Sequence, residues 1–127
     1  MKKIYVTAVE VGEPTVVLID EPIELSLAKD LNPGERMLVD SDQLEFLYIL
    51  ENEEGYYYLA FAKPIWESLN KLRKQEHRCI VHLHEKVKLE LTKFVDELEY
   101  LVSNIEGNGN YGVEMEEAVR YMFLDNE

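Results

Sequence analysis

The amino-acid sequence predicts an α+β protein with a mainly antiparallel sheet of about five to seven strands. It also predicts one helix in the middle of the chain and a C-terminal helical pair packed on one face of the sheet. Two changes of hydrophobic period support this: alternation dominates the first half, and helical spacing follows Pro64 and again Thr92. With 127 residues, 46% of them apolar, the chain has the size of a single domain, residues 1–127.

The first two strands are expected at Lys2–Glu10 and Thr15–Ile19, and Gly12-Glu13-Pro14 breaks the chain between them. This arrangement predicts a hairpin. Strict alternation in the first strand predicts two sets of side chains on opposite faces: Ile4, Val6 and Ala8 on one, and Tyr5, Thr7 and Val9 on the other.

After Pro22, Ile23, Leu25 and Leu27 alternate with polar residues, as in an edge strand. Asn32-Pro33-Gly34 is a turn signal, because proline fixes φ and glycine tolerates a positive φ. A short strand is then expected at Arg36–Val39.

Leu44–Glu51 and Tyr56–Ala62 form the strongest hairpin candidate, joined around Asn52–Gly55. Both faces of the second strand are apolar or aromatic. This pattern is typical of a central strand that is covered on both sides, by helices or by a partner chain.

The middle helix is expected to begin at Pro64, with apolar residues at helical spacing up to Leu72 and cations at its C-terminal end. Two more strands are expected at Arg78–His84 and Lys86–Leu91. Thr92 is a candidate N-cap for a long amphipathic helix that ends near Gly107. The last helix is expected at Val113–Leu124.

The formal net charge is −13, from 26 acidic and 13 basic residues. Such a charge disfavours direct binding to nucleic acid or to an anionic membrane, so we expect neither as a partner. Seven of the thirteen basic residues lie between Lys71 and Lys93, which makes the rest of the chain more acidic still. With Cys79 as the single cysteine, no internal disulfide forms, and a cytoplasmic location is predicted.

Three histidines, His77, His82 and His84, lie near Cys79. In a strand, His82 and His84 share one face while Cys79 points to the other, which separates the apparent Cys-x-x-His pair. A structural zinc site needs four ligands, and the sequence holds no second Cys or His cluster. We therefore expect no metal and no cofactor.

Two segments offer an alternative ligand or active site. Asp40 and Asp42 form an Asp-x-Asp pair of the kind that binds Mg²⁺, although turn chemistry explains them as well. The second segment, Gly107–Gly112, is rich in glycine and asparagine and resembles an anion cradle. It lacks the lysine of a P-loop, however, and three glutamates follow it. Its candidate ligand-binding residues are Asn108, Asn110 and Tyr111. A tight helix–helix connection is the simpler interpretation.

Met37–Phe61, Trp66 and Glu97–Val119 resemble the YjbL-like family of small uncharacterised cytoplasmic proteins of low-GC Gram-positive bacteria. The similarity spans Arg36–Phe123, is weaker in the middle, and is most specific in the string Asn104–Gly112. The resemblance implies a cytoplasmic single-domain protein. It implies no activity, and no site residue is carried over from it.

No catalytic residue stands out, because the serines lack a nucleophile-elbow context and Cys79 reads as a buried strand residue. The leading hypothesis is a non-enzymatic interaction or regulatory module that binds a protein partner or a second copy. Its predicted contact residues are Tyr48, Tyr56, Tyr58 and Trp66. The alternatives are a ligand-binding protein or enzyme built on Asp40, Asp42 and Asn108–Tyr111, and an acidic mimic of nucleic acid.

Overall fold

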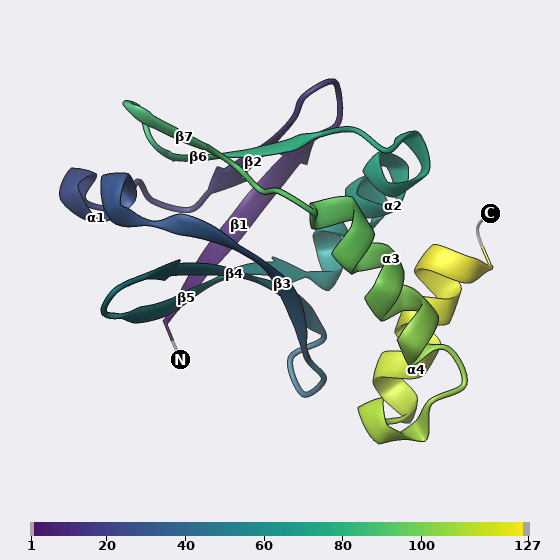
Figure 1. The fold of residues 1–127 in the computed structure, drawn as a ribbon. Helices are drawn as coiled ribbons and strands as arrows, with labels where there is room; N and C mark the ends of the chain where they lie inside the picture. Colours follow the sequence, from purple (N-terminus) through teal and green to yellow (C-terminus); the bar gives the residue numbers. More distant parts are fainter. Residues whose placement is uncertain (1, 126–127) are drawn as a thin grey trace.

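Seven strands form one curled sheet in the order β3-β4-β5-β1-β2-β6-β7 (Figure 1). A computed structural model describes residues 2–125. The strands are β1 (Lys3–Glu10), β2 (Thr15–Ile19), β3 (Asn32–Asp40), β4 (Glu45–Asn52), β5 (Gly55–Ala62), β6 (Cys79–His84) and β7 (Val87–Glu90). The α-helices are α1 (Leu25–Asp30), α2 (Trp66–Gln75), α3 (Phe94–Ile105) and α4 (Val113–Val119). Shorter helical turns are η1 (Lys63–Ile65), η2 (Gly109–Tyr111) and the π-helical η3 (Arg120–Leu124).

The sheet is mixed, with most neighbouring strands antiparallel. The pairs β1–β2, β3–β4, β4–β5 and β6–β7 are antiparallel, whereas β1–β5 and β2–β6 are parallel. The α+β class, the strand number, the middle helix and the C-terminal helices are therefore confirmed. The parallel pairs arise because the N-terminal hairpin lies between the two later parts of the sheet, a strand order that local patterns do not specify.

Helices α2, α3 and α4 gather on one side of the sheet (Figure 1). There they cover the side of the β4–β5 hairpin that carries Phe46, Tyr48, Leu50, Leu59 and Phe61, all with an exposed fraction of 0%. Aromatic rings form the centre of this core. Phe46 lies 5.0 Å from Trp66 and 5.7 Å from Phe123, measured between ring centroids.

Helix α3 lies beside β3, one of the two edge strands of the sheet. The Met37 backbone N–H donates to Oε1 of Glu97 on α3 at 3.2 Å. The Tyr48 hydroxyl donates to the Thr92 carbonyl, just before α3, at 2.7 Å. The first bond fixes α3 against β3 and satisfies an edge N–H that would otherwise face water or a second strand, and the other bond ties the start of α3 to β4.

A buried cation, Arg73, joins α2 to the C-terminal helices. Its guanidinium donates to Oδ1 of Asn70, to the Phe123 carbonyl at 2.8 Å and to Oε1 of Glu99 at 2.8 Å. Asn70 in turn donates to the Met122 carbonyl at 3.1 Å. Because these carbonyls lie in the last helical turn, the network holds the end of the described chain on α2 and α3.

The strict alternation predicted for the first strand is wrong beyond Val6. A β-bulge lies between Val6 and Ala8, so Val9 joins Val6 in the core. An extra residue in one strand shifts the side-chain phase by one, and the sequence pattern gave no sign of it.

The edge strand expected at Ile23–Leu27 is also wrong, because this segment leads into helix α1. Ala28 is buried there, and the Ile23 N–H donates to the Leu83 carbonyl of β6. Leucine, alanine and lysine favour a helix, and an alternation of three residues was too short to outweigh them.

The predicted turn at Asn32-Pro33-Gly34 and the predicted N-cap at Thr92 are both absent from the structure. Asn32-Pro33-Gly34 lies within β3 at a bulge, and Glu35 rather than Gly34 takes the positive φ, +57°. Thr92 makes no side-chain cap, and Lys93, with φ of +62°, is the residue that precedes α3. In both places a residue other than glycine takes a positive φ, which the local residue preferences did not indicate.

Candidate functional site

The β4–β5 hairpin has a second apolar face, on the side away from the core. Strand register places its side chains next to one another: Tyr5 opposite Ala60, Leu38 opposite Leu47, and Tyr58 opposite Ile49. We call this surface the outer face. It comprises Tyr5, Leu38, Leu47, Ile49, Tyr56, Tyr58 and Ala60.

The outer face has two layers. Leu47, Ile49 and Ala60 are buried, with exposed fractions of 3% or less. Above them Tyr5, Leu38 and Tyr56 are 51%, 44% and 50% exposed. In the described part of the chain, none of these side chains belongs to the core that the helices complete. The result is a small exposed apolar layer on a rigid, closely packed base.

Gly34 shows how closely the bulge of β3 approaches this base. A Cβ added to Gly34 would lie 2.9 Å from Cγ2 and 2.9 Å from the backbone O of Ile49. Glycine is therefore required here by close approach, not by a positive φ. The backbone of the bulge helps to cover Ile49.

Charged groups border the outer face at both ends. Lys3 donates to Asp40 at 2.8 Å and to Glu45 at 2.6 Å, and the Lys3 and Glu45 side chains are only 13% and 8% exposed. Burial alone lowers the pKa of Lys3, but the two carboxylates outweigh it and raise that pKa. The Lys3 hydrogen bond, followed by the Gln43 N–H, lowers the pKa of Asp40. At the other end Arg36 lies 3.9 Å from Glu51 and over the Tyr56 ring.

The structure separates the four predicted contact residues into two pairs. Tyr56 and Tyr58 lie on the outer face, whereas Tyr48 and Trp66 are completely buried and are corrected to core residues. Burial, opposed in part by the hydrogen bond to Thr92, raises the pKa of Tyr48 to about 12. The Trp66 indole N–H donates to the Phe61 carbonyl at 2.9 Å. Both polar tips are satisfied inside the molecule.

Sequence reasoning missed two of the exposed residues of the outer face, Tyr5 and Leu38. The alternation did place Tyr5 opposite Ile4, but the partner strands of β1 were unknown. Only the parallel pairing of β1 with β5 brings Tyr5 beside Tyr58 and Ala60. No short motif carries that information.

The two segments of the predicted ligand site have separate sets of hydrogen bonds. Asp40 bonds to Lys3 and to the Gln43 N–H, and Asp42 is exposed in the β3–β4 turn. Asn108 accepts from the Asn110 N–H, and the Tyr111 hydroxyl accepts from Asn104. In residues 2–125, no hydrogen bond found joins one segment to the other, and Asn110 is exposed. Turn chemistry and a helix–helix connection explain them.

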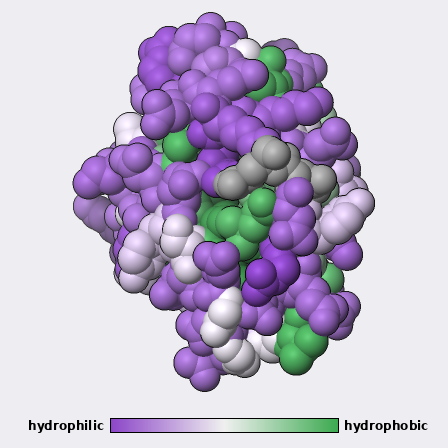
Figure 2. Space-filling model, turned by 90° about the vertical axis from the view of Figure 1, so that its right-hand side faces the viewer, coloured by the Kyte–Doolittle hydropathy of each residue, from purple (hydrophilic) through white to green (hydrophobic). Residues whose placement is uncertain are grey.

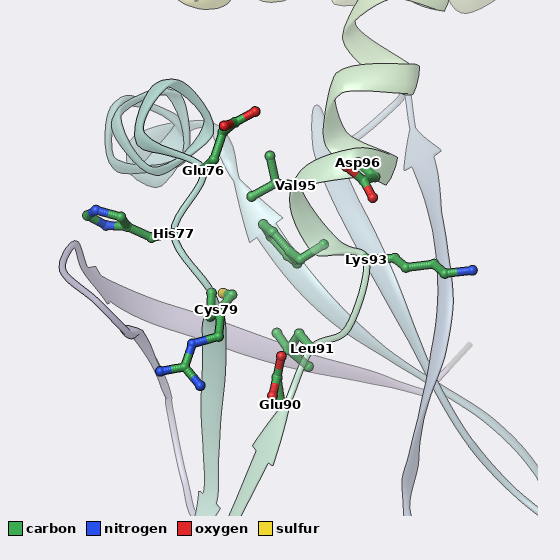
Figure 3. Close-up of a pocket in the computed structure, with 10 residues that line it drawn as sticks. Glu76, His77, Cys79, Glu90, Leu91, Lys93, Val95 and Asp96 are labelled. Carbon is green, nitrogen blue, oxygen red and sulfur yellow. The ribbon is translucent and has the colours of Figure 1, made fainter.

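A cavity of about 320 Å³ opens where β6, β7 and α3 meet (Figure 3). Cys79 and Leu91 lie at its base, and His77 and Lys93 point away from each other and out of the cavity. Burial raises the pKa of the Cys79 thiol to about 12, so the thiolate needed for nucleophilic chemistry is scarce at neutral pH. The cavity therefore offers no converging set of nucleophile and base.

The other two histidines, on β6, line a cavity beside β2. His82 and His84 line a cavity of about 350 Å³ together with Leu18 and Lys88. Nδ1 of His84 accepts from the Lys86 N–H at 3.1 Å. Among residues 2–125, no group of three or more His, Cys, Asp or Glu side chains is placed to hold a metal ion.

The helical side of the molecule differs from the outer face. Figure 2 shows a mainly hydrophilic surface there, with hydrophobic residues gathered in a hollow near its centre. A cavity of about 380 Å³ on the helices is lined by Pro64, Trp66, Ala118, Tyr121 and Met122, among others. None of the described helices has the length and apolar character to cross a membrane.

Fold and surface thus define a small α+β protein with an apolar patch on its sheet and no evident catalytic centre in the described residues. A model for a family of unknown function, UPF0738, matches residues 4–123, so the chain belongs to the UPF0738 family. This supports the expected small uncharacterised bacterial family, but not the YjbL name.

Relatives cover nearly the whole chain. A UPF0738 protein of Shouchella clausii is 45% identical over 97% of this chain and 100% of the relative. UPF0738 proteins of Bacillus cytotoxicus and Halalkalibacterium halodurans are each 40% identical, over 96% and 97% of this chain and 98% of each relative. No solved structure matches the chain.

Proposed function

We propose that this chain is a protein-interaction module, acting in the cytoplasm, that docks a protein partner on the outer face. One observation carries the proposal: Tyr5, Leu38 and Tyr56 are about half exposed on one surface, above a buried apolar layer. Tyrosine is enriched at protein interfaces because its ring is apolar and its hydroxyl tolerates water.

The rigidity of this surface supports the proposal. The side chains project from four neighbouring strands of the sheet, β3, β4, β5 and β1, and not from loops, so little conformational entropy is lost when they are covered. The Lys3–Asp40–Glu45 cluster and the Arg36–Tyr56 contact hold both ends of the surface in place. A preformed patch of this kind suits a regulator or adaptor.

The enzyme alternative receives less support from the geometry. The Asp40 and Asn108–Tyr111 segments are satisfied separately, and the Cys79 thiol is buried. The nucleic-acid mimic is also less well supported. The acidic residues near the outer face surround apolar side chains, and Lys3 neutralises two of them in part, so they do not resemble a row of phosphates. Neither alternative explains the exposed Leu38.

A photo-crosslinker tests the proposal directly. Leu38→p-benzoylphenylalanine places the probe on the outer face, and Tyr100→p-benzoylphenylalanine places it at a 65% exposed position on α3. In the bacterium from which the chain comes, we expect a discrete protein adduct from position 38, identified by mass spectrometry, and none from position 100. Equal adducts from both positions, or none from position 38, would contradict the proposal.

A further inference from the structure

We infer that the partner of the outer face is a different protein whose contact surface carries lysine or arginine around an apolar centre. This inference rests on the proposed function and names the chemistry of the partner. A second copy of the chain is the occupant that it excludes.

The charge of the β3–β5 region is the first step. Residues 32–62 contain seven acidic residues and one basic residue, Arg36. This quarter of the chain therefore contributes −6 to the formal net charge of −13. The basic residues cluster elsewhere in the sequence, mainly between Lys71 and Lys93.

The second step is which acids are already paired. Lys3 engages Asp40 and Glu45, and Arg36 lies 3.9 Å from Glu51. Glu35, Asp42, Glu53 and Glu54 are exposed, and no ion pair to them is found in the described residues. We call the last three, which lie in turns, the acidic border.

The acidic border lies at both ends of the hairpin. Asp42 is in the turn between β3 and β4, and Glu53 and Glu54 are in the turn between β4 and β5. The Asn52 side chain accepts from the backbone N–H groups of Glu54 and Gly55, which fixes the second turn. An apolar surface with carboxylates at both ends favours a partner with cations at the matching positions.

Symmetry argues against a second copy. A two-fold dimer through this face would use the same patch on both chains. The acidic borders would then approach each other around an apolar contact, with Lys3 and Arg36 already engaged within each copy. Like charges at a contact cost affinity, and a net charge of −13 on each chain adds to that cost.

A matched pair of charge reversals tests the inference in the crosslinking assay with the probe at position 38. Glu53→Lys with Glu54→Lys reverses the acidic border, and Glu106→Lys with Glu117→Lys makes the same change of net charge at exposed positions on the helical side. We expect the first pair to lower the adduct yield at least fivefold. The second pair should change it less than twofold.

The outcomes separate the inference from the proposed function. An adduct with a distinct protein, crosslinked within a segment rich in lysine or arginine and lost in the first pair only, supports both. An adduct with a second copy of the chain, or one equally insensitive to both pairs, overturns the inference while the proposed function stands. Absence of any adduct from position 38 removes the proposed function itself.

Discussion

The two faces of the β4–β5 hairpin have similar composition and different surroundings. On the inner face Phe46, Tyr48 and Phe61 are completely buried beneath helices. On the outer face Tyr56 and Tyr5 remain about half exposed. Composition alone therefore did not distinguish core from surface in this hairpin, and the positions of the helices did.

The comparison separates stability from binding. Side chains on the inner face contribute the burial on which folding depends. Exposed side chains on the outer face contribute less to folding, since much of their surface still contacts water in the native state. Similar substitutions on the two faces should therefore have different effects on the free energy of unfolding: large on the inner face and small at the exposed positions of the outer face.

The largest effect is expected at Trp66, at the centre of the inner side. Trp66→Ala removes contacts with Phe46 and Phe123 and leaves the Phe61 carbonyl without its indole donor. We expect the free energy of unfolding to fall by about 4 kcal/mol, measured by urea denaturation. A loss below about 1 kcal/mol would show that the helices do not pack on the hairpin as described.

Arg73 tests whether the C-terminal helices are fixed to this core. Arg73→Met removes the bonds to Asn70, Glu99 and the Phe123 carbonyl. We expect a loss of about 3 kcal/mol, because buried acceptors lose their donor. The substitution should accelerate backbone hydrogen exchange more in α4 and η3 than in β4. An equal acceleration across the chain would contradict a local role for Arg73.

The fold class followed from the sequence because hydrophobic period and turn residues are local signals. They placed β4, β5 and α3 within a few residues of their observed bounds. The bulge at Val6–Ala8, the helix at Leu25–Asp30 and the parallel pairing of β1 were not predictable, since each depends on distant partners.

For the candidate site, too, local patterns identified some residues, and the others depended on contacts between distant segments. Tyr56 and Tyr58 were identified because alternation in β5 left apolar side chains on both faces. Tyr48 was misplaced because the face of β4 that α3 covers depends on tertiary packing, including the hydrogen bond to Thr92. Leu38 could not be associated with them without the β3–β4 register.

Lys3 tests how firmly the border of the outer face is held. Lys3→Met leaves Glu45, 8% exposed at its side chain, without its cation, and we expect a loss of about 2 kcal/mol at pH 7. The lowered pKa of Asp40 means that its stabilising contribution is lost as the pH falls through that pKa.

The raised pKa of Lys3 means that its contribution is complete below its ordinary pKa and is lost only in strong alkali. The difference in the free energy of unfolding between wild type and Lys3→Met should therefore stay constant from about pH 5 to about pH 10 and shrink in acid. Urea denaturation at several pH values measures it. A gap that widens below pH 4 would contradict the assigned pairing.

Gly34 tests the packing beneath the exposed layer. Gly34→Ala places a methyl group 2.9 Å from Cγ2 and the backbone O of Ile49, so the bulge must move. We expect a loss of about 1.5 kcal/mol in urea denaturation. Gly109→Ala is the control, because a Cβ there meets no atom within 4 Å and φ lies outside the positive range. Equal losses at the two positions would contradict the close approach.

Tyr56 sharpens the comparison most, because stability and binding should separate there. Tyr56→Ser removes a half-exposed ring and its contact with Arg36, so we expect less than about 1 kcal/mol of lost stability. The crosslinked adduct from position 38 should nevertheless fall severalfold, since the ring would no longer be covered by the partner. Tyr100→Ser, at a 65% exposed position on α3, should change neither quantity. If Tyr56→Ser unfolds the chain, or leaves the adduct unchanged, the outer face serves the fold in the way the inner face does, and its role as a docking surface is lost.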